Sequence, residues 1–90
     1  MKKSQKQNHT LRSPADIGPA LKLIRNNLHL TQNALSEMTG IKQQTLSAIE
    51  SGTQLANLKT LFAILSTLNL ELVVNQRSQR IKGFAPGSNF

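Results

Sequence analysis

The side chains with the clearest chemical potential lie together in the middle of the chain. They carry ammonium, amide and hydroxyl groups, and they are Lys42, Gln43, Gln44, Thr45 and Ser47. No carboxylate interrupts this run before Glu50. Lysine can bond guanine O6 and N7, glutamine can bond adenine in a bidentate manner, and a face without carboxylates is not repelled by phosphates. The segment therefore favours contact with nucleic acid.

Residue types that support catalysis or metal binding are scarce. The chain has no cysteine, which excludes disulfides, thiolate nucleophiles and thiolate metal sites. The two histidines, His9 and His29, lie far apart without acidic residues at ligand spacing. The sequence also lacks paired carboxylates at useful spacing and a glycine loop that could cradle phosphates. We expect a protein that is not an enzyme and that needs no cofactor or metal.

Two short helices joined by a glycine turn are predicted to position the polar run. The first is expected over residues 31–39 with Thr31 as its cap, and the second runs from residue 42 or 43 to 51. Gly40 and Gly52 end them, because glycine adopts the left-handed conformation at least cost. Apolar residues are expected to lock the pair together, namely Ala34, Leu35, Met38, Leu46 and Ile49. This arrangement is typical of a helix-turn-helix.

Two further helices are predicted, one on each side of this pair. Ser13 can cap the first, with Pro14 at its first position and Asp16 in its first turn. Asn57 can cap the other, which Asn69 ends. Both carry apolar residues at helical spacing, which are expected to be buried. These are Ile17, Leu21, Ile24 and Leu28 in the first, and Leu58, Leu61, Phe62, Leu65 and Leu68 in the second.

The period of the sequence changes from 3.6 to 2 after Asn69, which predicts a strand over residues 70–75. A lone strand leaves its backbone hydrogen-bonding groups unpaired. Pairing with the same strand of a second copy would resolve this and form a homodimer. The expected interface residues are Leu70, Leu72, Val73 and Val74. The alternative is that the strand packs on its own domain.

The net charge of +7 is carried by the two ends of the chain. Four cations precede Ser13 and three follow Gln76, while the four cations and four acidic residues between them cancel. We interpret residues 1–12 as a disordered basic arm, 13–76 as the folded domain and 77–90 as a disordered basic tail. Basic arms favour a polyanionic partner, nucleic acid ahead of membrane, although they can also be merely solubilising.

The apolar runs predict neither a membrane segment nor a secretory signal. None approaches the roughly 20 apolar residues that a membrane helix requires. The basic start, from Met1 to Asn8, is not followed by an apolar region. A cytoplasmic protein is therefore expected.

The middle of the chain resembles the phage-repressor (Xre/Cro-like) helix-turn-helix family, from about Leu21 to Leu70. The pattern is Thr31-Gln32-x-x-Leu35-x-x-x-x-Gly40-Ile41, then Gln44-Thr45-Leu46-Ser47-x-Ile49-Glu50-x-Gly52. The chain departs from this family at Ser36, Lys42 and Ala56. The resemblance implies a mainly α, lambda-repressor-like domain of four to five helices, here with one C-terminal β-strand that pairs across a dimer.

The resemblance also implies roles for individual residues. Gln32 would bond a phosphate, with Thr31 close enough to help, and the alternative is that Thr31 only caps while Gln32 is solvated. Arg25 and Glu50 would tie the first helix to the third. The chemistry of the side chains makes Lys42, Gln43 and Gln44 the expected base-reading residues, and the alternative for each is simple exposure or a phosphate contact. Thr45 and Ser47 could touch a thymine methyl group or a phosphate, and the alternative for Ser47 is a hydroxyl exposed on the helix surface.

A closer resemblance is to the HipB antitoxins. It is carried by the run from Leu21 to Arg25, by the Gly40-Ile41-Lys42-Gln43 step and by the strand from Leu70 to Val74. It implies a nucleoid-associated homodimer that binds double-stranded DNA at an inverted-repeat operator and represses its own operon. It also implies a HipA-like serine/threonine kinase toxin as partner. The alternative is a stand-alone Xre-type repressor without a toxin.

Overall fold

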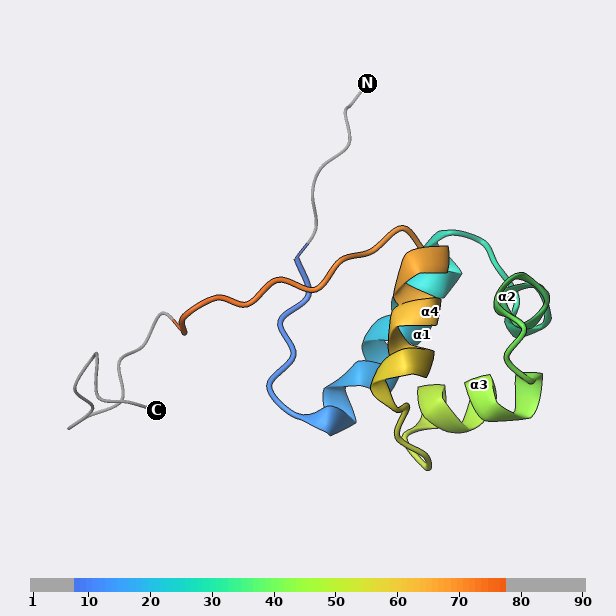
Figure 1. Cartoon of the computed structure of the whole chain (residues 1–90), viewed down its shortest axis with the longest axis horizontal. Helices are drawn as coiled ribbons and strands as arrows, with labels where there is room; N and C mark the ends of the chain where they lie inside the picture. The colour runs from blue at the N-terminus through green and yellow to red at the C-terminus, as the bar shows by residue number, and fades with distance from the viewer. Residues whose placement is uncertain (1–7, 78–90) are drawn as a thin grey trace, which may run out of the picture.

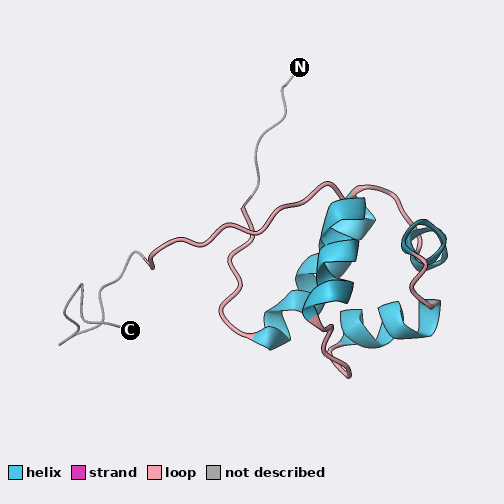
Figure 2. Ribbon diagram, in the orientation of Figure 1, coloured by secondary structure: helices cyan, strands magenta, loops and turns pink. Residues whose placement is uncertain are grey.

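This computed structural model describes residues 8–77 of the chain, which contain four α-helices and one short 3-10 helix (Figures 1 and 2). In chain order they are η1 (Pro14–Asp16), α1 (Ile17–Asn27), α2 (Gln32–Thr39), α3 (Gln43–Ser51) and α4 (Leu58–Thr67). The mainly α architecture and the order of the helices agree with the sequence-based expectation. Parts of the predicted basic arm and tail, residues 1–7 and 78–90, lie outside the described residues.

Local side-chain contacts fix where the helices begin. Thr31 Oγ1 accepts a hydrogen bond from the Ala34 amide at 2.9 Å, and Asn57 Oδ1 accepts one from the Thr60 amide at 2.8 Å. Both caps were predicted, and each satisfies a backbone donor that the first helical turn leaves free. At the entrance to η1 the Asp16 carboxylate accepts the amides of Arg12 and Ser13, at 2.8 and 3.1 Å.

The core lies between the helices and is made of leucine and isoleucine. Its buried members are Leu21, Leu35, Leu46, Ile49, Leu61, Ile64, Leu65 and Leu68. Four residues that the apolar periodicity predicted to be buried are about half exposed or more, namely Leu28, Met38, Leu58 and Phe62. That prediction was wrong because each of these short helices buries only a narrow stripe. Leu58 and Phe62, four residues apart, lie together on the outer side of α4.

Helices α1 and α3 approach each other at Gly18. A Cβ atom at this position would overlap the carbonyl oxygens of Ile49 and Glu50, at the C-terminal end of α3. Only the missing side chain of glycine permits this approach. The apolar pattern gave no indication of it, since Gly18 lies between the predicted core positions.

The segment after α4 leaves the helical body as a trace with no helix or strand assignment (Figure 2). Leu70 packs against the core, and residues 71–77 are exposed. Within residues 8–77 no strand is assigned, because a strand requires a hydrogen-bonded partner and the chain supplies none here. The predicted pairing involves a second copy, so it remains a prediction about the dimer.

No helix within residues 8–77 combines the length and the apolar character that crossing a membrane would require.

Candidate nucleic-acid interface

Helices α2 and α3 are joined by a turn that hydroxyl groups hold in place. Gly40 adopts φ = 80°, the left-handed conformation expected of it. Thr39 Oγ1 donates to the Leu35 carbonyl at 2.8 Å and accepts the Ile41 amide at 3.1 Å. Ser36 Oγ donates to the Ile41 carbonyl at 2.5 Å. Ser36, noted in the sequence only as a departure from the family pattern, therefore helps to fix the orientation of α3 relative to α2.

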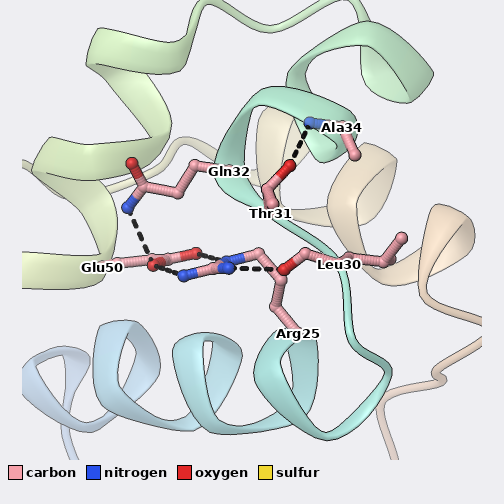
Figure 3. A network of polar contacts seen from close by, with 6 residues as sticks. All are labelled: Arg25, Leu30, Thr31, Gln32, Ala34 and Glu50. Atoms are coloured by element: carbon pink, nitrogen blue, oxygen red, sulfur yellow. Dashed lines mark hydrogen bonds and ion pairs between the residues drawn. The ribbon is translucent and has the colours of Figure 1, made fainter.

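A buried ion pair connects α1 to the end of α3 (Figure 3). Arg25 Nε donates to Glu50 Oε2 at 2.7 Å and Nη2 donates to Oε1 at 2.9 Å, which is a bidentate pair. Arg25 Nη1 also donates to the Leu30 carbonyl at 2.6 Å, just before α2. The predicted tie between the first and third helices is present, and it extends to the loop that leads into α2.

Gln32, at the start of α2, belongs to the same network. Its Nε2 donates to Glu50 Oε1 at 3.0 Å (Figure 3). The residue is half-buried, so it is neither fully solvated nor free to rotate. An amide nitrogen carries two hydrogens, and this bond uses one of them. The sequence gave no signal for this contact, because 18 residues separate the partners.

Burial and hydrogen bonding shift the pKa of the Glu50 carboxyl in opposite directions. Burial raises the pKa of Glu50, whereas the hydrogen bonds from Arg25 and Gln32 and the positive charges of Arg25 and Lys22 lower it by more. The pKa of Glu50 therefore lies below its ordinary value. The same hydrogen bond raises the pKa of Arg25 against the opposing effect of burial, and the charge of Glu50 adds to the rise. The pair is ionised at neutral pH.

The outer face of α3 presents the polar run to solvent. Lys42, Gln43, Gln44 and Ser47 are exposed, and Thr45 is half-buried. An open hollow runs from this face to the start of α2. It is lined by Gln32, Gln43, Gln44, Ser47, Ala48, Ser51 and Thr53. The structure thus brings four of the predicted site residues together around one hollow.

The remaining predicted site residues do not line that hollow. The hydroxyl of Thr31 is occupied by the cap of α2. Lys42 precedes α3 as its N-terminal flanking residue. The predicted dimer residues belong to the segment after α4, where Leu72, Val73 and Val74 are 48%, 65% and 97% exposed. Ser51 and Thr53, which the sequence did not single out, contribute hydroxyl groups to the hollow.

A family model described as Helix-turn-helix matches residues 21–75, which include α1 from Leu21 onward and the whole of α2, α3 and α4. The chain belongs to this helix-turn-helix family. Within the family it is similar to the antitoxin HipB of Escherichia coli K12, with 37% identity over 62 residues. HipB of E. coli O6:H1 strain CFT073 gives the same identity over the same length. The match covers 69% of this chain and spans 70% and 66% of the two antitoxins.

Solved structures that contain HipB give the same result in three dimensions. A complex of HipB with the O4 20mer aligns with a TM-score of 0.70 and 33% identity, over 77% of this chain and 97% of that one. A complex of HipA, HipB and O2-O3 aligns with a TM-score of 0.69 at the same identity and coverage. These values confirm the mainly α, helix-turn-helix fold class and the resemblance to HipB.

Proposed function

We propose that this helix-turn-helix protein binds duplex DNA sequence-specifically through the outer face of α3 and represses transcription there. The observation that carries the proposal is the charge pattern of this face. Its exposed residues are a lysine, two glutamines and two serines, none of them acidic. The nearby carboxylate of Glu50 is directed inward and neutralised by Arg25. A groove lined by phosphates therefore meets donors without a repelling charge.

The proposed contacts follow from position. Lys42, Gln43 and Gln44 read base edges, while Thr45 and Ser47 contact a thymine methyl group or a phosphate. Gln32 bonds a phosphate beside α3 through its second amide hydrogen, the first being held by Glu50. In this arrangement the ion pair has an indirect role, because it fixes the direction in which Gln32 points.

A charge-matched pair of variants tests the α3 face. Lys42→Ala and Lys59→Ala remove the same charge from exposed residues, one beside α3 and the other on α4. We expect Lys42→Ala to weaken binding to a duplex from upstream of the protein's own gene by about 1–3 kcal/mol. Lys59→Ala should bind within a few-fold of the wild type. Equal losses for both variants, measured by fluorescence anisotropy at one fixed salt concentration, would reject the proposed face.

We also propose that the protein acts as a homodimer on an inverted repeat. Leu70 packs against the core, and the period of a strand places Leu72 and Val74 on the same side. Pairing of this segment with its two-fold copy would cover exposed apolar residues and satisfy free backbone groups. Two α3 helices related by a two-fold axis would then meet half-sites about one helical turn apart.

The similarity to HipB supports a narrower role, that of an antitoxin. We propose that the protein binds a HipA-like serine/threonine kinase, represses the operon that encodes both, and has no catalytic role itself. A pull-down with the product of the neighbouring gene tests this role. If that protein is not retained while the duplex is still bound, the protein is a stand-alone Xre-type repressor.

A further inference from the structure

We propose that residues 8–12 form an edge strand in the dimer, and that residues 8–12 of each copy pair with residues 70–74 of the other copy. The resulting sheet has four strands. Their order is residues 8–12 of one copy, residues 70–74 of the second copy, residues 70–74 of the first copy and residues 8–12 of the second copy. This inference rests on the proposed dimer, in which residues 70–74 pair about a two-fold axis. It adds a second intermolecular contact, made by a part of the chain that precedes the helix-turn-helix domain.

Both segments line one hollow on the same side of the helical body. In Figure 1 the blue chain before η1 and the orange chain after α4 lie on this side, and their traces cross in this view. Its lining consists of two stretches far apart in sequence, namely Asn8, His9, Thr10, Leu11 and Arg12, and Glu71, Leu72, Val73, Asn75, Gln76 and Arg77.

The hollow is of a size that side chains, rather than solvent alone, can fill. Its volume is about 520 Å³, which is roughly seventeen times the share of one water molecule in the liquid. Five extended residues span about 16 Å, close to the length of an ordinary strand. Residues 8–12 and 71–77 are each long enough to pair with a strand placed between them.

The backbone of both segments is available for pairing. Within residues 8–77, no backbone hydrogen bond involves residues 8–11 or 71–77. The two segments also share no backbone hydrogen bond with each other. A strand inserted between them would take up hydrogen bonds from both sides. The partner's residues 70–74 fit this place, because the two-fold pairing already brings them to residues 70–74 of the first copy.

The charges around the hollow match that occupant. Arg12 and Arg77 contribute two cations to its lining and Glu71 contributes one carboxylate. The entering segment carries the partner's Glu71 and has no cation between Leu70 and Gln76. A second copy therefore brings a carboxylate to a site where two guanidinium groups lie. The same arrangement closes the outer edges of a two-stranded sheet, which by itself would be marginally stable and exposed.

Proline variants test the backbone pairing. Successive N–H groups of a strand point to opposite edges, so either Thr10 or Leu11 directs its N–H group toward the neighbouring strand. Proline at that position removes the hydrogen-bond donor, and making both variants ensures that one of them does so. We expect Thr10→Pro or Leu11→Pro to raise the dimer dissociation constant about tenfold, measured by sedimentation. The matched variants Thr10→Val and Leu11→Val keep the N–H group and should leave the dimer dissociation constant unchanged. If neither proline variant dimerises more weakly than its valine counterpart, the inference is wrong.

Cysteine cross-linking tests which copy the segment contacts. The chain has no cysteine, so a Thr10→Cys chain and a Val73→Cys chain of different tag length can be mixed and oxidised. We expect a disulfide between the two different chains, because each Thr10 lies near the partner's strand. In the double variant Thr10→Cys/Val73→Cys, a disulfide confined to one chain would overturn the inference. A wild-type chain that sediments as a monomer would overturn the proposed dimer as well, whereas a dimer without the mixed disulfide overturns only the edge strand.

Discussion

At the scale of single residues, Glu50 links Arg25 on α1 with Gln32 on α2. It accepts two hydrogen bonds from Arg25 and one from Gln32, and it is almost completely buried. A buried carboxylate is tolerated only with partners of this kind, and removal of one partner leaves the other charge unsatisfied. The residue therefore supports the fold and the orientation of Gln32 at the same time.

This arrangement makes the stability of the protein depend on pH. Because the folded-state pKa of Glu50 is lowered, its contribution to the free energy of unfolding is complete above the ordinary value of 4.5. The contribution is lost as the pH falls through the lower, folded-state pKa. We expect Glu50→Gln to cost roughly 3 kcal/mol at neutral pH in urea unfolding, and the difference from wild type to narrow in acid.

The exposed Glu37 on α2 provides the matched control. Glu37→Gln removes the same charge but no buried partner, so its unfolding free energy should follow that of the wild type across the pH range. If Glu50→Gln retained a constant difference from wild type down to the acid limit of folding, the ion pair would not be the source of the pH dependence.

At the scale of helices, the relative position of α1 and α3 depends on Gly18. The ion pair ties these helices together, and the glycine permits their close approach. Alanine normally stabilises a helix relative to glycine by about 1 kcal/mol. Here the added methyl group would meet the backbone carbonyls of Ile49 and Glu50, which cannot rotate away as a flexible side chain would.

We therefore expect Gly18→Ala to destabilise the protein in spite of its higher helix propensity. Overpacking of this kind typically costs 1–3 kcal/mol, and the midpoint of thermal or urea unfolding measures it. Asn26→Ala, at an exposed position of the same helix, gains propensity without a clash and should keep or raise the stability. A Gly18→Ala variant as stable as Asn26→Ala would mean that α1 can move away from α3 at little cost.

At the scale of the whole molecule, the exposed apolar segment after α4 governs assembly. Leu72, Val73 and Val74 are unusually exposed for their type, Val74 at 97%. Exposure of these apolar side chains to water is unfavourable, and pairing with a two-fold partner would cover them. DNA binding should follow assembly, because each half-site needs its own α3.

Val74→Asp is expected to weaken the dimer by about 2–3 kcal/mol, since Val74 lies on the same side of the strand as Leu70 and a carboxylate there would be buried without a partner. This is a rise of roughly a hundredfold in the dissociation constant measured by sedimentation. Ser66→Asp adds the same charge on the exposed side of α4 and serves as the control. If Val74→Asp sediments as the wild type does, the dimer seam lies elsewhere.

The sequence by itself determined the features that depend on residues close to one another along the chain. The caps at Thr31 and Asn57, the left-handed Gly40 and the order of four helices all depend on neighbours within about four residues. Such contacts form whenever the local residues permit them, so pattern and spacing were enough to predict them. The polar run from Lys42 to Ser47 was predicted in the same way, and its exposure on α3 agrees with that prediction.

Only the tertiary structure decided which groups meet across the chain. The bond from Gln32 to Glu50, the closeness of Gly18 to α3 and the exposure of Met38 and Phe62 depend on how the helices pack. Apolar periodicity indicates which side of a helix is apolar, but not how wide a stripe the neighbouring helices cover. Pairing of the segment after α4 depends on a second copy, because backbone groups of a strand are satisfied by a partner and not by the strand itself.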